Sequence, residues 1–213
     1  MPFGVDEAGK GPVLGSMFAA SVVAEPDRLP AEIADSKTLA PERRENLAAR
    51  LHADSKVSIG IAEIPVARID DPATDMNELT VAAHVEALGA VDVAGQTGTV
   101  DAGDVNADRF GRRVAKRLDA DLTIRAEHGA DERHPLVSAA SVVAKVARDA
   151  HVAELNEEFA APIGSGYPGD EQTRTFLRDY VETHGELPAC ARRSWQTSAD
   201  VLAAAAQSDL GEF

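Results

Sequence analysis

The sequence predicts an α/β fold in which helices flank a mixed five-stranded sheet. Five short apolar or alternating segments between residues 3 and 126 have the composition of strands, and helical patterns separate the later ones. No apolar run approaches the ~20 residues that are needed to cross a bilayer. With 213 residues, the chain is long enough to bury a core without disulfide bonds.

The charge of the chain is unusual. Its formal net charge is -15, and few of its 21 basic residues are lysines. Taken alone, such a composition argues against a nucleic-acid partner, because phosphate binding normally needs a basic surface. At 1 M salt, however, the Debye length is only ~3 Å, so self-repulsion costs little. We therefore interpret the chain as halophilic, in which case its net charge says nothing about its ligand.

The first expected strand ends in two adjacent carboxylates. Residues 3–5 are a short apolar run that leads into Asp6 and Glu7. Because side chains alternate between the faces of a strand, Val5 points to a core and Asp6 to a cleft. The glycine-rich residues 9–11 follow, and glycines can take positive φ and bring backbone N–H groups close to a ligand. An acidic pair beside such a turn suits a divalent metal held against a phosphate.

Two further strands are expected before residue 66. Residues 13–23 are a long apolar run that indicates a buried strand, and residues 57–65 indicate the next one. A helix lies between them, because Pro41 suits a first helical turn and Leu47 and Leu51 form an i, i+4 apolar edge. We expect the three strands to pair as an antiparallel meander.

Helix and strand then alternate. Asp75 and Glu78 offer capping chemistry for one helix, and residues 97–101 form a strand that ends in Asp101. Asn106 can cap the next helix, which carries a basic cluster. The cluster consists of Arg109, Arg112, Arg113, Lys116 and Arg117.

A fifth strand is expected at residues 122–126, followed by a loop that carries Asp131. A long helix is then expected from residue 138 to residue 159, and a glycine-rich break at residues 164–168 leads into a small helical region. Four polar residues of the long helix fall on one face, at i, i+3, i+7 and i+10. They are Ser138, Ser141, Lys145 and Arg148.

Four carboxylates stand at or beside the ends of the expected strands: Asp6, Glu7, Asp101 and Asp131. Sites of open α/β sheets gather outside the carboxyl ends of strands, so the four converge if the first and fourth strands are neighbours. Clustered like charges imply bound cations, and oxygen ligands favour Mg²⁺ or Mn²⁺ over Zn²⁺. Because no histidine pair has metal-ligand spacing, three histidines are interpreted as non-ligands, namely His84, His128 and His134.

Six short motifs occur in order along the chain. They are DEAGKGP at residues 6–12, DSKTL at 35–39, VDA at 100–102, AD at 130–131, SAASVVAKVARD at 138–149 and GSGYP at 164–168. Together they resemble the motifs of type 2 ribonuclease H, the ribonuclease HII family, and most of all its archaeal branch. Each motif alone is weak, but six in order are specific. The resemblance extends from Phe3 to about Trp195.

The resemblance implies a ribonuclease H-like fold and assigns roles to residues. It implies that the catalytic carboxylates, which bind two divalent ions (Mg²⁺ or Mn²⁺), are Asp6, Glu7, Asp101 and Asp131. The turn expected to read the ribose 2′-OH consists of Gly9, Lys10 and Gly11. Tyr167 is expected to pack at the ribonucleotide–deoxyribonucleotide junction. Lys10 stands where the family usually has Arg. Ser36 and Lys37 are expected to lie beside the phosphate track of the substrate.

The implied activity is endonucleolytic hydrolysis of RNA in RNA–DNA hybrids and incision at ribonucleotides embedded in duplex DNA. Two divalent ions can stabilise both the attacking and the leaving oxygen of a phosphodiester. The 2′-OH is the group that distinguishes RNA from DNA at a single residue. The expected products carry a 5′-phosphate and a 3′-hydroxyl.

Other interpretations stay open. Asp149 is a rival for the role of Asp131, Ser36 and Lys37 also suit a solvated loop, and Tyr167 also suits a cover for the long helix. The basic cluster is more often a solvated face than a duplex contact. A non-catalytic module that binds nucleic acid or a protein has no need of four clustered acids. A different nuclease on the same scaffold, such as an exonuclease or a resolvase, has no need of the glycine turn.

We expect a catalytic domain over residues 1–160, a helical extension over 161–206 and a tail over 207–213. The tail residues Gln207, Leu210 and Phe213 resemble the peptide by which replication proteins dock on the sliding clamp, where one helical turn places the last two on one side. We otherwise expect a cytoplasmic monomer without membrane contact. Cys190 is the only cysteine, which excludes an internal disulfide and a thiolate zinc cluster.

Overall fold

The structure is a computed structural model that describes residues 1–33, 39–118 and 120–210, with backbone alone for residues 208–210. Ser36, Lys37 and Phe213 lie outside the described residues, as does the side chain of Leu210. The chain forms two compact units, whereas the expected domain boundaries stay a prediction. The first unit consists of Met1–Lys10, Met17–Ile64 and Asp75–Arg148, and the second unit of Gly11–Ser16, Pro65–Thr74 and Asp149–Phe213.

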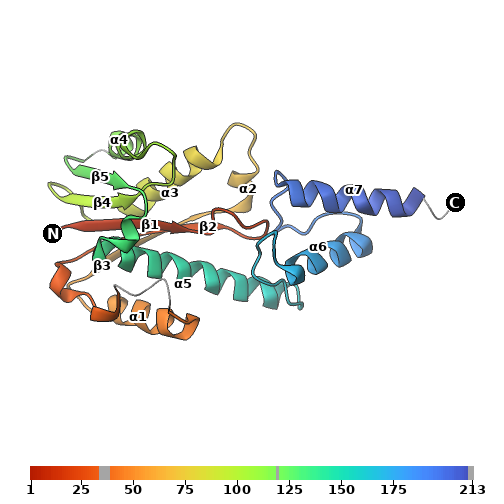
Figure 1. The fold of residues 1–213 in the computed structure, drawn as a ribbon, viewed down its shortest axis with the longest axis horizontal. Helices are drawn as coiled ribbons and strands as arrows, with labels where there is room; N and C mark the ends of the chain where they lie inside the picture. Colours follow the sequence, from red (N-terminus) through yellow and green to blue (C-terminus); the bar gives the residue numbers. More distant parts are fainter. Residues whose placement is uncertain (34–38, 119, 211–213) are drawn as a thin grey trace. The chain divides into compact units, whose positions relative to one another are not determined.

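The first unit is built on a mixed five-stranded sheet with the strand order β3-β2-β1-β4-β5 (Figure 1). The strands are β1 (Phe3–Ala8), β2 (Met17–Val23), β3 (Ser58–Ile64), β4 (Thr97–Asp101) and β5 (Thr123–Glu127). β2 pairs antiparallel with both β1 and β3, whereas β4 pairs parallel with both β1 and β5. The α/β fold class and the meander are therefore confirmed, and the first and fourth strands are neighbours, which is the condition for the acids to converge.

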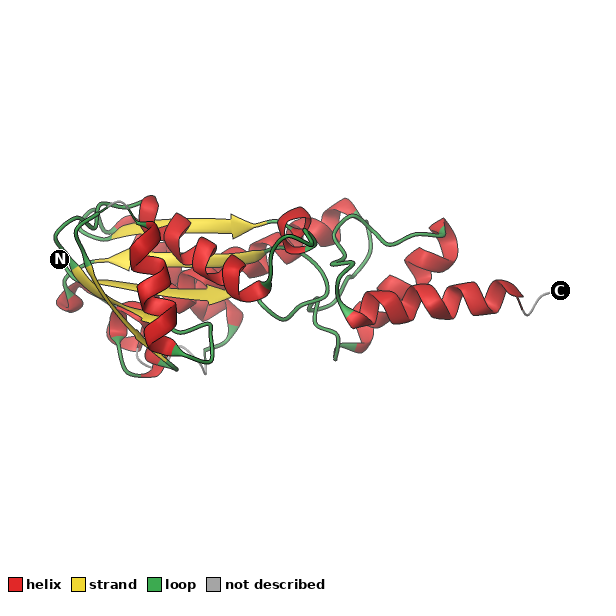
Figure 2. Cartoon of the chain, turned by 90° about the horizontal axis from the view of Figure 1, so that it is seen from above, coloured by secondary structure: helices red, strands yellow, loops and turns green. Residues whose placement is uncertain are grey.

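Helices lie on both faces of this sheet (Figure 2). The helices of the chain are α1 (Pro41–Ala53), α2 (Val66–Ile69), α3 (Met76–Gly89), α4 (Ala107–Arg117), α5 (Pro135–Glu158), α6 (Glu171–His184) and α7 (Gln196–Leu210), with 3-10 turns η1 (Pro26–Arg28) and η3 (Ala130–Glu132). In the first unit, α1 and α5 pack on one face, where Val22 and Leu51 are buried. α3 and α4 pack on the other, where Val5 and Phe110 are buried. The sheet is thus the middle layer of three.

The alternation of β1 between these two layers is as the sequence predicts. Phe3 and Val5 point to the layer of α3 and α4, where both are almost completely buried. Gly4 faces α5 instead, and it lies so close that an added Cβ would be 2.3 Å from the carbonyl carbon of Leu136. The absence of a side chain at Gly4 is what allows β1 and α5 to approach.

The second strand is shorter than expected. The apolar run begins at Val13, but β2 begins only at Met17. Gly15 has φ +80°, a left-handed conformation that ends an extended run. Val13 and Leu14 instead donate their backbone N–H groups to the carbonyl of Gly166, and they belong to the core of the second unit. The other expected strands agree with the structure to within one residue at each end where the chain is described.

Helix capping follows the sequence in part. The Asp75 carboxylate accepts hydrogen bonds from the backbone N–H groups of Asn77 and Glu78, and the Asn106 side chain accepts one from Arg109. The expected return bond of a capping box is not made by Glu78, whose carboxylate pairs with arginines of α4. A charged partner on a neighbouring helix gives a stronger hydrogen bond than a neutral backbone N–H group.

The second unit has a core of its own, which includes Leu14, Leu177 and Cys190. The Arg192 guanidinium is fully buried there and donates from Nε to the carbonyl of Gly15, 2.9 Å away. The alanine-rich helix α7 continues to Leu210, so residues that were expected in the tail form its last turn. None of the helices in the described part of the chain has the length and hydrophobicity to span a bilayer.

The contact at Gly4 generates a stability prediction. We expect Gly4→Ala to lower the free energy of unfolding by about 1–3 kcal/mol, the usual cost of overpacking, because the new methyl group meets helix backbone that cannot rotate away. The matched control is Gly89→Ala at the end of α3, where no described atom beyond the adjacent residues and the backbone of the helix itself lies within 4 Å of the added Cβ. That change should leave stability unchanged or raise it by up to about 1 kcal/mol. Urea denaturation measures both, and equal midpoints for the two variants would contradict the close packing of β1 on α5.

Candidate active site

Two carboxylates lie side by side where the central parallel strands end. β1 and β4 pair in a register that sets Val5 opposite Val100. One residue further on, Asp6 and Asp101 therefore leave the sheet on the same face, because side chains alternate along both strands. Asp6 is 6% exposed and Asp101 is partly buried. The expected convergence of these two acids is what the register of the sheet produces.

The Asp6 carboxylate is held inside the first unit. Its Oδ1 accepts the backbone N–H of Glu7 at 2.7 Å, and it also contacts the hydroxyl of Ser141 on α5. Burial raises the pKa of Asp6 well above its ordinary value of 3.8, and the negative charges of Glu7 and Asp101 raise it further. The ionised form of Asp6 is therefore electrostatically unfavourable, and a nearby cation would stabilise it.

Asp101 connects β4 to the segment that carries Asp131. Its Oδ1 accepts the backbone N–H of Ala130 at 2.6 Å, at the start of η3. Burial raises the pKa of Asp101, with smaller increases from the charges of Glu7 and Asp131. Asp131 follows Ala130 directly, so the hydrogen bond at Asp101 places Asp131 close to the other acids. All four predicted carboxylates thus belong to one electrostatic cluster in the first unit.

The Glu7 side chain has a partner that the sequence interpretation missed. Oε2 of Glu7 lies 2.8 Å from Nε2 of His84, which is fully buried on α3. Because Glu7 and Asp6 are adjacent in a strand, Glu7 points to the layer of α3 while Asp6 points to that of α5. The sequence interpretation treated His84 only as a non-ligand, and no contact was expected for it. Its place in the apolar row of a helix was the available signal, since a buried histidine needs a hydrogen-bond partner.

The turn after β1 is fixed by glycine and by a lysine contact. Gly9 is buried and has φ +85°, whereas Gly11 does not take a left-handed conformation. The Lys10 ammonium donates to the carbonyl of Gly103, in the loop after β4. A Cβ at Gly103 would lie 2.5 Å from the Thr80 side chain, so this loop packs tightly on α3. Lys10 therefore ties the exit of β1 to the exit of β4.

Tyr167 and Gly11 lie together in the second unit. The Tyr167 side chain is exposed, and a Cβ added at Gly11 would be 3.6 Å from its ring. The indole N–H of Trp195 donates to the carbonyl of Gly11 at 3.3 Å. An exposed aromatic ring beside a backbone turn is a surface on which a sugar or a base can stack.

The expected polar face of α5 is buried at its start. Ser138 and Ser141 are each 1% exposed. The Ser138 hydroxyl donates to the carbonyl of Ile33 at 2.6 Å, and Lys145 donates to the Ser141 hydroxyl at 2.9 Å. Ser141 and Lys145 thus lie on one face of the helix, and the carbonyl of Ile33 and Asp6 of β1 lie against the start of that face.

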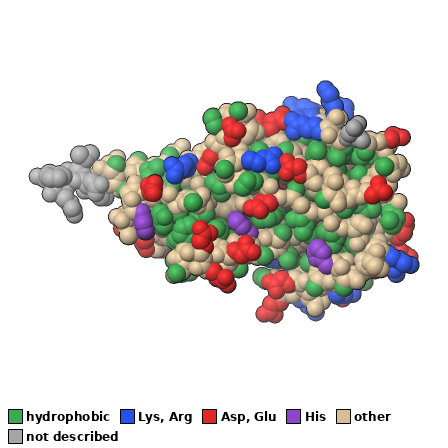
Figure 3. Space-filling view, turned by 180° about the vertical axis from the view of Figure 1, so that it is seen from behind, with side chains coloured by type: hydrophobic (Ala, Val, Ile, Leu, Met, Phe, Trp, Pro, Cys, Tyr) green, Lys and Arg blue, Asp and Glu red, His purple; other side chains and the backbone are tan. Residues whose placement is uncertain are grey.

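Three residues of the basic cluster of α4 are paired with acids, namely Arg109, Arg113 and Arg117. Arg109 forms a bidentate contact with the buried Asp104, at 3.1 and 2.7 Å, and holds the pKa of that carboxyl below its ordinary value. Arg113 and Arg117 both contact Glu78. Asp and Glu side chains are scattered over the visible face of the molecule (Figure 3). The positive charge of α4 is thus partly neutralised within the first unit.

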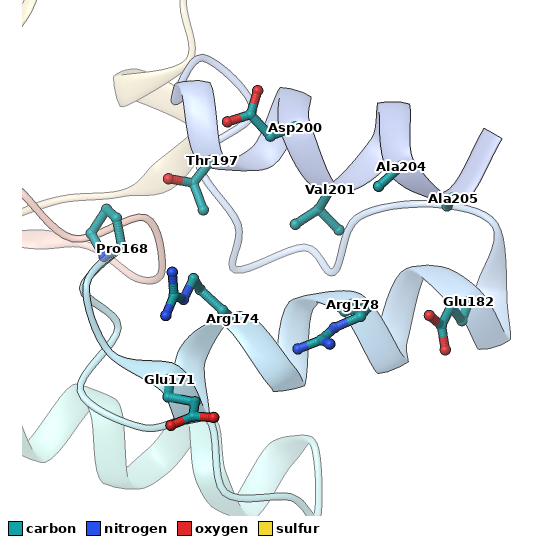
Figure 4. A pocket seen from close by; sticks show the side chains of 10 residues that line it. All are labelled: Pro168, Glu171, Arg174, Arg178, Glu182, Thr197, Asp200, Val201, Ala204 and Ala205. Carbon is teal, nitrogen blue, oxygen red and sulfur yellow. The ribbon is translucent and has the colours of Figure 1, made fainter. Parts of the chain in front are cut away.

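A groove of the second unit contains none of the four carboxylates. It has a volume of about 560 Å³ and lies between α6, which contributes Arg174 and Arg178, and α7, which contributes Asp200 and Val201 (Figure 4). Its lining mixes both signs of charge with small apolar side chains. It therefore lacks the clustered carboxylates that divalent-metal chemistry needs.

The donor chemistry of the acidic cluster fits a divalent ion that prefers oxygen. No group of three or more Asp, Glu, His or Cys side chains in the described part of the chain stands in a ready metal-binding arrangement. The four side chains are nevertheless all carboxylates, and burial and mutual repulsion raise the pKa values of Asp6 and Asp101. A hard cation such as Mg²⁺ or Mn²⁺ relieves both costs, so these residues suit such an ion.

A mixed sheet of this strand order, with acids at the ends of its two central parallel strands, defines a nuclease of the ribonuclease H-like class. The model of the family described as Ribonuclease HII matches residues 3–198. The chain therefore belongs to the ribonuclease HII family. It is a nuclease of the ribonuclease H type, as the order of its six motifs predicts.

Relatives of known identity agree with this assignment. A ribonuclease HII of Halobacterium salinarum is 63% identical over 211 residues, which cover 99% of each chain. The crystal structure of ribonuclease H2 from Pyrococcus horikoshii superposes with a TM-score of 0.87 at 32% identity, covering 97% of this chain and 99% of that one. A ribonuclease HII of Archaeoglobus fulgidus, solved in complex with PCNA, gives a TM-score of 0.83 at 33% identity, covering 94% and 96%. The archaeal and halophilic character inferred from the sequence is confirmed by these relatives.

Asp6 and Asp104 should respond to pH in opposite ways. The folded-state pKa of Asp6 is raised, so its ionisation costs stability as pH rises from about 3.8 through the folded pKa. The pKa of Asp104 is lowered by Arg109, so its contribution is complete above 3.8 and is lost as pH falls through the folded pKa. At pH 7 we therefore expect Asp6→Asn to raise the unfolding temperature and Asp104→Asn to lower it.

Thermal unfolding between pH 3 and pH 8, at constant salt and with a chelator present, measures both shifts. Each difference from the parent protein should shrink as the solution is acidified, because protonation removes the cost of the Asp6 charge and, at lower pH, the benefit of the Asp104 charge. Shifts of the same sign for both variants at pH 7 would contradict the electrostatic description of the site.

Proposed function

We propose that this protein is an endoribonuclease that hydrolyses the RNA strand of RNA–DNA hybrids and incises duplex DNA at embedded ribonucleotides. Its products carry a 5′-phosphate and a 3′-hydroxyl. The observation that carries the proposal is the cluster of Asp6, Glu7, Asp101 and Asp131 at the ends of β1 and β4, in a chain of the ribonuclease HII family. A binding module gains nothing from such a cluster, because buried like charges cost stability.

The four carboxylates are proposed to hold two divalent ions, Mg²⁺ or Mn²⁺. When bound, such ions supply a nucleophilic water and stabilise the charge on the leaving oxygen. The chain supplies the orientation of the ligands: the backbone N–H of Glu7 holds Asp6, and that of Ala130 holds Asp101. Backbone donors cannot rotate away, so these two carboxylates are already oriented for metal binding.

Residues 9–11 are proposed to read the ribose 2′-OH, with Tyr167 stacking at the junction between ribonucleotide and deoxyribonucleotide. The left-handed conformation of Gly9 and the lack of a side chain at Gly11 support a close approach of substrate to the backbone. Because Lys10 donates to Gly103, its proposed role includes shaping the turn as well as adding positive charge. Ser36 and Lys37 stay predicted phosphate contacts in the segment outside the described residues.

Cleavage of a labelled duplex with one embedded ribonucleotide tests the proposal. The parent protein should cut this duplex and an RNA–DNA hybrid with Mg²⁺ or Mn²⁺, and it should leave an all-DNA duplex of the same sequence intact. Asp101→Asn should lower the cleavage rate by about 10³-fold, since several kcal/mol of charge stabilisation are lost. Asp104→Asn is the matched control, and it should keep most of the activity when assayed below its unfolding temperature. Cleavage of the all-DNA duplex, or cleavage without metal, would rule the proposal out.

We also propose that Gln207, Leu210 and Phe213 dock on the sliding clamp. The structure of the Archaeoglobus fulgidus ribonuclease HII in complex with PCNA supports this proposal for a relative of 33% identity. Gln207 is exposed on the last turn of α7, and the helix backbone continues to Leu210. A peptide whose first residues are already helical binds more favourably, because part of its conformational entropy is lost before binding.

Calorimetry with the purified clamp of the same organism tests docking. We expect micromolar affinity, or roughly -8 kcal/mol, for so short a peptide. A chain that ends at Ala206 should release no heat of binding, and Gln207→Ala should weaken the interaction. Asp209→Ala, at a position between the proposed contacts, is the matched control and should bind like the parent. Equal heats from the full and the shortened chain would show that the tail does not dock.

A further inference from the structure

We propose that His84 is a positioning residue, which orients the Glu7 carboxylate for metal binding. The inference rests on the proposed function, because it takes Glu7 as a metal ligand. His84 itself binds neither metal nor substrate in this proposal. It acts through one hydrogen bond, from its Nε2 atom to Oε2 of Glu7.

His84 is completely enclosed. It is 0% exposed and lies on the face of α3 that packs on the sheet. Its ring meets Phe110 of α4 edge to face, with centroids 5.0 Å apart and an angle of 88° between the ring planes. Nε2 is 2.8 Å from Oε2 of Glu7, whose side chain is 10% exposed. A ring held on all sides defines the position of its nitrogen atoms.

The direction of the hydrogen bond follows from the two ring nitrogens. Nδ1 of His84 is buried and has no hydrogen-bond partner among the described residues. A proton on Nδ1 alone would leave a buried donor unpaired and would set the lone pair of Nε2 against a carboxylate. The proton therefore resides on Nε2, which donates to Glu7.

The second oxygen of Glu7 is confined from another side. A Cβ added at Gly103 would lie 3.0 Å from Oε1, so this oxygen rests against the loop that follows β4. Oε2 is held by His84, and Oε1 lies close to Gly103, where a side chain would crowd it. A ligand that is already ordered loses less conformational entropy when it binds a metal. His84 thus gives Glu7 the same preorganisation that backbone N–H groups give to Asp6 and Asp101.

A role in packing alone makes different predictions from a role in positioning. Phenylalanine fills a buried position beside Phe110 but donates no hydrogen bond. Glutamine has its amide nitrogen the same number of bonds from Cβ as Nε2 of histidine, so it can restore the donor without the ring. His84→Phe and His84→Gln therefore separate the shape of the side chain from its hydrogen bond.

The experiment measures Mn²⁺ binding by calorimetry without substrate, and steady-state cleavage of the duplex with one embedded ribonucleotide. For His84→Phe we expect Mn²⁺ binding to weaken about tenfold and kcat to fall by a similar factor, the lower end of the usual effect of a residue that supports a metal ligand. KM for the duplex should stay unchanged, because His84 does not touch the duplex. His84→Gln should recover most of both losses.

Three results would contradict the proposed role of His84, and each points to a different cause. Parent-like Mn²⁺ affinity and kcat in His84→Phe would reject the positioning role. Folded His84→Gln that is no better than His84→Phe would assign the effect to packing and reject the role as well. If the parent protein binds Mn²⁺ no better than Asp6→Asn, the metal site of the proposed function fails, and the role of His84 fails with it.

Discussion

The contact between Gly4 of β1 and the backbone of α5 determines where the acidic residues lie. β1 is the central strand, and it can approach α5 because Gly4 has no side chain. The strict alternation of the strand then places Phe3 and Val5 in one core layer, and the same alternation carries Asp6 and Glu7 to opposite faces where the strand ends. The packing of this buried strand therefore also determines the positions of Asp6 and Glu7 in the candidate active site.

Electrostatic pairing differs sharply between the acidic cluster and its surroundings. Asp104 and Glu78 lie in the same unit, and both are paired with arginines of α4. The carboxylates of Asp6 and Asp101 have only neutral donors on the oxygens described, and burial raises their pKa values. In a protein of net charge -15, repulsion among carboxylates would be relieved by any nearby arginine. The arginines of α4 instead pair with Asp104 and Glu78, so the repulsion among the clustered carboxylates is not relieved by them.

The sequence predicted the features that depend on local rules. Strand alternation, the caps at Asp75 and Asn106, and the antiparallel meander of the first three strands depend on periodicity, side-chain chemistry and strand succession. It failed where residues far apart decide the outcome. Residues 13–16 have the composition of a strand, but Val13 and Leu14 donate to Gly166 and Gly15 donates to Cys190, both in distant segments. The contact between Glu7 and His84 joins residues 77 positions apart, and no pattern along a single chain records such a pair.

The single cysteine has a practical consequence. Cys190 is buried in the core of the second unit, and desolvation raises the pKa of its thiol to about 12. At neutral pH it is therefore almost entirely protonated and unreactive toward thiol reagents. A cysteine introduced at an exposed position, such as Val105 at 91% exposure, would accept a fluorophore or a spin label alone. If a second cysteine were introduced on α6 or α7, a pair of labels would report the distance between the two units. The buried Cys190 would not interfere with such a measurement in the presence of a duplex.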